Sequence, residues 1–221
     1  MLFDIDGTLM RGVGHHHKRA LIDAVAHVSG RAATLDGVAT AGTLDLDLIA
    51  NMLQASGESK TKIESLSREI TKRTGALYQD YCRDDLSVFV CRDVRITLAE
   101  LHSRGAVTAL VTGNLEKIAW RKMDLAGLRH YFPMGAFSED GSTRGELAQV
   151  AAERAIAQGW VTDQARVSLI GDHPNDIQAA KANGFQSIAV ATGVTPLTEL
   201  KAHTPDIAVE HLGELDLDRL F

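Results

Sequence analysis

Residues 106–114 read Ala-Val-Thr-Ala-Leu-Val-Thr-Gly-Asn. The first six form an apolar run with β-branched members, which is typical of a strand buried on both faces of a sheet. A helical pattern follows from about residue 115 to residue 126 and stops at Gly127. A buried strand that leads directly into a helix predicts a βαβ unit and therefore a parallel sheet.

The same alternation of strands and helices continues on both sides of this stretch. Further helices are expected at 144–158 and 175–182, and another helix ends at Gly105. Short apolar runs predict the remaining strands, at 1–3, 167–170, 187–191 and 207–209. Strands separated by helices in this order predict an α/β fold with a parallel sheet.

One long block interrupts this alternation. Between residues 17 and 84, apolar residues recur at helical spacing, and Gly30, Gly37, Gly42 and Gly57 divide the block into three or four helices joined by short loops. We interpret the block as an inserted helical cap that covers residues 15–84. Residues 1–14 and 85–221 then form the core that carries the sheet.

Length and charge narrow the class of protein. The 221 residues suit one large domain or one domain with an insertion, and the net charge of −6 provides no basic surface for nucleic acid or an anionic membrane. No apolar run approaches the ~20 residues of a membrane span, and we expect no signal peptide. A cytoplasmic protein is therefore expected, with Cys82 and Cys91 as reduced thiols.

His15, His16 and His17 are expected in a solvated loop, because three adjacent histidines cannot all face one ion.

Acidic or hydroxyl side chains follow three of the expected strands. Asp4 and Asp6 follow the first, Thr112 follows the strand at 106–111, and Asp172 and Asp176 follow the strand at 167–170. Each segment alone has an ordinary explanation, such as a turn or the first turn of a helix. In a parallel sheet, however, the three strand ends lie on one edge, which is where such sheets bind ligands.

Four carboxylates at one edge would repel each other and destabilise the fold unless a cation lay among them. Oxygen ligands without a cysteine or histidine cluster suit Mg²⁺, which also binds substrate phosphate. A carboxylate beside Mg²⁺ and phosphate-binding donors is a plausible nucleophile toward phosphorus, and a second carboxylate can transfer protons.

The segments Asp-Ile-Asp-Gly-Thr at 4–8, Val-Thr-Gly-Asn at 111–114 and Gly-Asp-x-x-x-Asp at 171–176 resemble, in this order, motifs of the haloacid dehalogenase superfamily. The pattern is most similar to phosphoglycolate-phosphatase-like members with a helical cap, and Ile118, Ala119 and Lys122 strengthen this similarity. The resemblance implies a Rossmann-like three-layer core with a parallel sheet and an inserted α-helical cap. It also implies a Mg²⁺-dependent phosphatase that hydrolyses a small phosphomonoester through an aspartyl-phosphate.

The same resemblance implies roles for the acidic residues. Asp4 would attack phosphorus, and Asp6 would protonate the leaving oxygen and then activate water. The Asp4 and Asp172 side chains and the Asp6 backbone carbonyl would bind Mg²⁺, and Asp176 would support the metal side.

The phosphate-binding residues are also implied by the family. Thr112, Gly113 and Asn114 would hold phosphate oxygens. A basic residue is expected before the Gly-Asp motif, and Arg144 stands in that place, with Arg154 and Arg166 as its rivals.

Several alternatives stay open at this stage. A phosphomutase of the same superfamily and a non-catalytic binding protein that keeps the fold are the main rivals, whereas a halide-releasing enzyme would not need Asp6. The segment 41–45 resembles a Gly-Arg-Thr-Asp segment of some relatives, but this chain has no basic residue there, which weakens the case for phosphoglycolate itself as the substrate. The expected partner is a small phosphorylated metabolite, and the expected oligomeric state is a monomer or homodimer.

Only three residues precede Asp4, so the first strand is short or the natural chain begins earlier.

Overall fold

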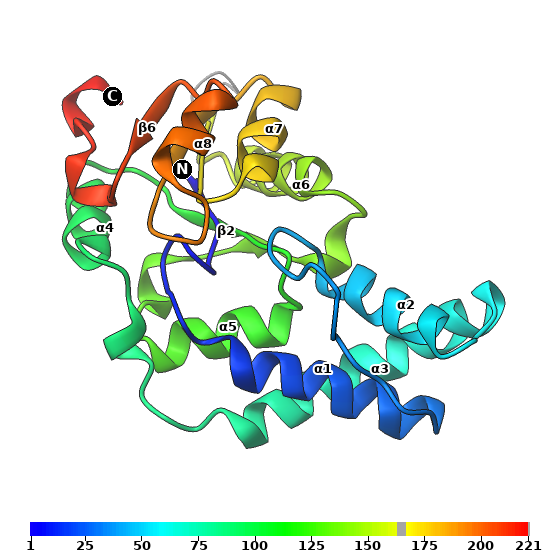
Figure 1. The fold of residues 1–221 in the computed structure, drawn as a ribbon. Helices are drawn as coiled ribbons and strands as arrows, with labels where there is room; N and C mark the ends of the chain where they lie inside the picture. The colour runs from blue at the N-terminus through cyan, green and yellow to red at the C-terminus, as the bar shows by residue number, and fades with distance from the viewer. Residues whose placement is uncertain (163–166, 221) are drawn as a thin grey trace.

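The computed structural model describes residues 1–162 and 167–220, and a six-stranded parallel sheet lies at its centre (Figure 1). The strand order is β3-β2-β1-β4-β5-β6. The strands are β1 (Leu2–Phe3), β2 (Ala109–Val111), β3 (Gly135–Ala136), β4 (Ser168–Gly171), β5 (Gln186–Val190) and β6 (Ile207–Val209). The predicted parallel α/β fold is therefore confirmed.

Helices cover both faces of the sheet and complete three layers. On one face lie α4 (Val94–Ser103) and α5 (Glu116–Leu125), and on the other lie α6 (Arg144–Ala157), α7 (Pro174–Ala182) and α8 (Leu197–Ala202). The pleat of β1 shows why both faces are apolar. Phe3 packs into the core on the α4 and α5 side, whereas Leu2 packs into the core on the α6 and α7 side. Short 3-10 turns are present at Ser87–Phe89, Arg129–Tyr131, Ser138–Asp140, Leu212–Glu214 and Leu217–Arg219.

Two strands differ from the sequence-based expectation. β3 was not predicted, because two small residues show no periodicity, and it forms through pairing with β2, with Leu110 opposite Gly135. β1 contains only two residues although it lies between β2 and β4. The Asp4 amide continues its ladder by donating to the carbonyl of Ile170 at 3.0 Å.

Three helices form the insertion between β1 and α4: α1 (Gly14–Ser29), α2 (Asp45–Ala55) and α3 (Lys60–Tyr81). Figure 1 shows them grouped beside α5, away from α6, α7 and α8. The connection between α1 and α2 spans residues 30–44 and is longer than the short loops expected.

The three adjacent histidines are in a helix, so the expected solvated loop is wrong. α1 begins at Gly14, directly after Val13, and therefore includes His15, His16 and His17 in its first turns. Helical geometry turns His17 inward while His15 stays exposed.

Among the described helices, none has the length and apolar character needed to cross a membrane.

Candidate active site

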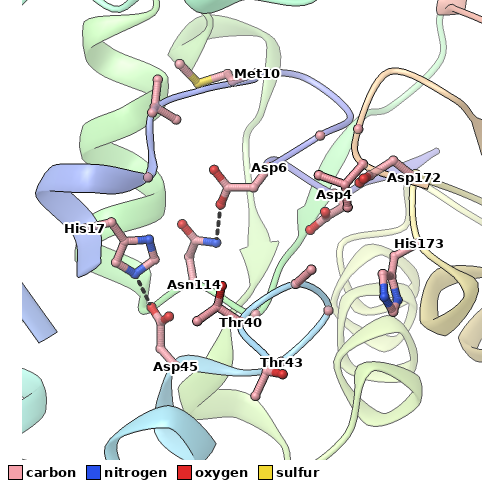
Figure 2. Close-up of a pocket in the computed structure, with 18 of the residues that line it drawn as sticks. Asp4, Asp6, Met10, His17, Thr40, Thr43, Asp45, Asn114, Asp172 and His173 are labelled. Atoms are coloured by element: carbon pink, nitrogen blue, oxygen red, sulfur yellow. Dashed lines mark hydrogen bonds and ion pairs between the residues drawn. The ribbon is translucent and has the colours of Figure 1, made fainter. Parts of the chain in front are cut away.

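The polar segments that follow β1, β2 and β4 meet at one edge of the sheet (Figure 2). Asp4 follows β1, Thr112 follows β2 and Asp172 follows β4. Because β1 pairs in parallel with both β2 and β4, the three strands present the same end at the same edge. Three segments more than 50 residues apart in sequence are thus gathered around one point.

Three buried carboxylates form an acidic cluster at this edge. Asp4, Asp172 and Asp176 each offer an oxygen, and these oxygens lie within 4.8 Å of one another. Burial raises the pKa of Asp4 to about 7 against the opposing charge of Arg144, with Asp176 and Asp6 adding to the rise. Burial, Asp4 and Asp176 likewise raise the pKa of Asp172 to about 8. A cation among these oxygens would remove the repulsion and favour their charged forms.

The cluster has the chemistry of a divalent-cation site. Asp176 Oδ1 is buried and accepts no hydrogen bond from the described residues, although Arg144 Nε lies 3.2 Å from it. Gly171 and Gly193 leave room for the carboxylates, since a Cβ at either position would collide with Asp176 or Asp172. Carboxylate oxygens of this kind suit Mg²⁺. The Asp6 carboxylate does not belong to this cluster of described residues.

Arg144 is the basic residue that the fold brings to the acidic cluster. It is the first residue of α6, where Thr143 caps the helix, and its side chain is only 8% exposed. Its guanidinium donates to Asp4 Oδ1 at 2.9 Å and to the carbonyl of Val111 at 3.2 Å, and Nε lies 3.2 Å from Asp176 Oδ1. Arg144 therefore binds Asp4 through a hydrogen bond and compensates the charge of Asp176 through an ion pair.

The rival arginines are not placed in the cluster. Arg154 bonds to both Asp140 oxygens, at 2.6 and 2.9 Å, and to the carbonyl of Gly135. Arg166 lies outside the described residues. Of the two described candidates, Arg144 is thus the one beside Asp4.

The loop after β2 is tightly bonded to itself and to its neighbours. Thr112 Oγ1 accepts from the Asn114 side-chain amide at 2.9 Å, and the same amide donates to Asp6 Oδ2 at 2.8 Å. Both hydrogens of this amide are therefore engaged, so the Asn114 side chain faces Asp6 rather than the acidic cluster. Gly113 lies directly under the insertion, and a Cβ there would be only 3.0 Å from the Thr43 carbonyl oxygen.

Asp6 is paired with a lysine that sequence reasoning did not place in the site. Lys122 Nζ lies 2.6 and 2.7 Å from the two Asp6 oxygens, and the lysine is fully buried. Partial burial disfavours the charged form of Asp6, but the charge of Lys122 and the hydrogen bonds from Lys122 and Asn114 outweigh it and hold the pKa of Asp6 below its ordinary value.

A signal for Lys122 was present in the sequence. It lies on the same helical face as Ile118, Ala119 and Met123, all of which are buried. A lysine on an apolar helical face is rarely buried without a partner. The face could have identified Lys122 as a paired cation, although not its partner.

The insertion contacts the core close to Asp6. Asp45, the first residue of α2, accepts a hydrogen bond from the Leu115 amide and pairs with His17 Nε2, both at 2.8 Å (Figure 2). The Asp45 amide in turn donates to the Gly113 carbonyl at 2.8 Å. These contacts hold α1 and α2 against the start of α5.

A cavity of about 380 Å³ lies between the insertion and the carboxyl edge of the sheet. Asp4, Asp6 and Asp172 line it from the core, and Thr40 and Thr43 line it from the insertion. Arg11 and Lys18, both exposed, also line the cavity. The cavity therefore combines a cluster able to hold a cation, a possible nucleophile and cationic groups for an anionic molecule.

Comparison with known proteins agrees with this geometry. A model of the haloacid dehalogenase-like hydrolase family matches residues 1–184. A phosphoglycolate phosphatase from Vibrio cholerae is 25% identical over 226 residues, which cover 96% of this chain and 93% of that protein. A protein from Caldanaerobacter subterraneus, provisionally named pyrophosphatase PpaX, is 29% identical over 140 residues, which cover 62% of this chain and 63% of that protein.

A solved structure has the same fold. The crystal structure of a β-phosphoglucomutase from Clostridium difficile superimposes with a TM-score of 0.69 and covers 99% of this chain and 93% of that chain. The sequence identity is 16%, so this similarity concerns the fold alone.

Proposed function

Because the chain belongs to the haloacid dehalogenase-like hydrolase family, we propose that it is a Mg²⁺-dependent phosphatase acting on a small phosphomonoester. The observation that carries the proposal is the placement of Asp4. Its carboxylate lies among Asp172, Asp176 and the Arg144 guanidinium, on the wall of a cavity. Relatives with phosphatase names support the reaction class.

The residues suit a reaction in two steps. Asp4 attacks phosphorus and forms an aspartyl-phosphate as the bond to the leaving oxygen breaks. Asp6 gives a proton to that oxygen in the first step and takes one from the attacking water in the second. Asp6 therefore enters the first step protonated and leaves it ionised, and the contacts of Lys122 with both of its oxygens favour the ionised form. In the second step this carboxylate takes a proton from the water that attacks phosphorus, and the bond between phosphorus and Asp4 breaks to release phosphate.

A metal would be held by the side chains of Asp4 and Asp172, with the Asp6 backbone carbonyl as a further ligand and Asp176 in support. When bound, Mg²⁺ supplies charge that neutralises a transferring phosphoryl group. Arg144 orients Asp4 for attack. Thr112 and Gly113 are the proposed phosphate-binding groups of the loop after β2, and Asn114 acts there chiefly through its bonds to Thr112 and Asp6.

We further propose that residues 15–84 act as a cap over a core of residues 1–14 and 85–221. The cap would exclude water from the cavity and select the substrate. The cavity volume of about 380 Å³ suits a small phosphorylated metabolite, and the exposed Arg11 and Lys18 suit a second anionic group on it.

The test is phosphate release from p-nitrophenyl phosphate and from a panel of small phosphorylated metabolites, with and without Mg²⁺. We expect Mg²⁺-dependent release, and an added phosphoryl group on the intact protein after quenching in acid. Asp4→Asn should abolish the adduct, Asp6→Asn should slow its formation and breakdown, and Asp172→Ala should weaken Mg²⁺ binding. Asp36→Asn, an exposed carboxylate in the 30–44 connection, is the control.

Three results would contradict the proposal. Interconversion of sugar phosphates faster than phosphate release would identify a phosphomutase. Binding of phosphorylated molecules without turnover would identify a binding protein. Release of chloride from 2-chloro acids faster than phosphate from any ester would identify a halide-releasing enzyme.

A further inference from the structure

Lys122 is a buried cation to which the proposed reaction assigns no step. Its ammonium group is fully buried, and it contacts both oxygens of Asp6 and donates to Asn114 Oδ1 at 2.6 Å. Burial of a lysine is costly unless its charge is paired and its hydrogens are bonded. The surroundings of Lys122 satisfy both requirements.

The third acceptor for Lys122 comes from the insertion. His17 Nδ1 lies 3.4 Å from Lys122 Nζ, and His17 Nε2 lies 2.8 Å from Asp45 Oδ2. If Nε2 carries the proton toward Asp45, then Nδ1 is free to accept from Lys122. The three hydrogens of the ammonium group then find acceptors on Asp6, Asn114 and His17.

These bonds fix the orientation of Asp6. Its side chain is 40% exposed, so water competes for its oxygens and the carboxylate can rotate unless it is held. Lys122 contacts both oxygens, and Asn114 donates to Oδ2 at 2.8 Å. A group that must reach first the leaving oxygen and then a water needs a defined orientation, since misplacement by about 1 Å can cost ~100-fold in rate.

The arrangement also links Asp6 to the position of the insertion. Asp45 belongs to α2 and His17 to α1, whereas Lys122 belongs to α5. Asp45 also accepts from the amide of Leu115, the residue directly before α5. If the insertion moved away, Lys122 would lose its third acceptor and the Leu115 amide would lose its partner.

Building on the phosphatase function proposed above, we propose that Lys122 is a positioning residue that orients Asp6, and that His17 and Asp45 complete this arrangement only while the insertion lies against the core. Proton transfer by Asp6 is thereby restricted to the form of the enzyme in which the insertion lies against the core.

The kinetic test uses Lys122→Met and Asp45→Ala, singly and together, with p-nitrophenyl phosphate and Mg²⁺. Each single change should lower kcat by at least ~10-fold while KM changes by less than about 3-fold, and the double variant should lose less than the product of the single losses. Lys117→Met, an exposed lysine on α5, and Asp47→Ala, an exposed acid in the first turn of α2, are the matched controls. A normal kcat in Lys122→Met, or single losses that multiply, would overturn the proposal.

A second measurement does not depend on turnover. Asp45→Ala should speed hydrogen exchange of the Leu115 amide, and Lys122→Met should shift the NMR resonances of the His17 ring, whereas the control variants should do neither. If the parent protein hydrolyses no phosphate ester, the phosphatase function fails, but these two measurements still test whether Lys122, His17 and Asp45 interact. Unchanged His17 resonances in Lys122→Met would refute this interaction. Circular dichroism of each variant shows whether a change in exchange or in resonances comes from unfolding instead.

Discussion

Arg144 should be the residue whose removal destabilises the metal-free protein most clearly. Its guanidinium lies between Asp4 and Asp176, at 2.9 and 3.2 Å, and is almost fully buried. Arg144→Met keeps most of the side-chain volume but leaves two buried carboxylates without their cation. Removing one partner of a buried ion pair costs about 3–5 kcal/mol of unfolding free energy. In a chain of this size, this corresponds to a fall of roughly 6–20 °C in Tm.

The loss should also depend on pH, because carboxylates without a cation take up protons. At pH 5.5 Asp4 and Asp176 can become neutral in the variant, so the penalty should be smaller than at pH 8 by about 1 kcal/mol or more, the equivalent of about one pKa unit. The assay is urea unfolding in EDTA at both pH values. Arg154→Met removes a 43% exposed partner of Asp140 and should cost about 1 kcal/mol or less.

Two results would refute this reasoning. An Arg144→Met protein as stable as its parent at pH 8 would show that the guanidinium does not compensate the acidic cluster. An equal loss at both pH values would show that the cost comes from packing rather than charge. The same variant should lower kcat/KM by at least ~10-fold, the value of a charge-assisted contact, whereas Arg154→Met should have little effect.

Further predictions concern the metal site and the insertion. In the folded protein the pKa of Asp4 is raised to about 7 and that of Asp172 to about 8. Between about pH 4 and 8 the folded protein therefore binds more protons than the unfolded chain. Its stability without metal should fall as the pH rises through this window. Mg²⁺ should therefore raise Tm more at pH 8 than at pH 5.5. Thermal melts with EDTA or with Mg²⁺ at each pH measure both effects. An equal rise of Tm with Mg²⁺ at both pH values would contradict the proposed metal site at Asp4 and Asp172. Gly113→Ala should push the Thr43 carbonyl away and lower kcat by at least ~10-fold. Hydrogen exchange of the Leu115 amide should become faster. An unchanged exchange rate would show that the loop accommodates the methyl group.

Much of the architecture could be read from local patterns. The apolar run at 106–111 predicted a buried strand, and β2 forms within it, although it begins only at Ala109. The order of strands and helices was sufficient to place Asp4, Thr112 and Asp172 at one sheet edge, because parallel neighbours end on the same side. Arg144 was chosen as the basic residue through the resemblance to a family rather than through spacing, and only the structure shows that it contacts Asp4.

The partners of the buried polar groups were decided only by the tertiary structure. Periodicity reports which face of a helix is buried, but not what that face meets, so the pairing of Lys122 with Asp6 across 116 residues left no local pattern. The same holds for His17, whose inward position depends on the helix that begins at Gly14 and on Asp45, a carboxylate 28 residues away. Local sequence determines hydrogen bonds within elements, whereas bonds between elements depend on how the elements pack against one another.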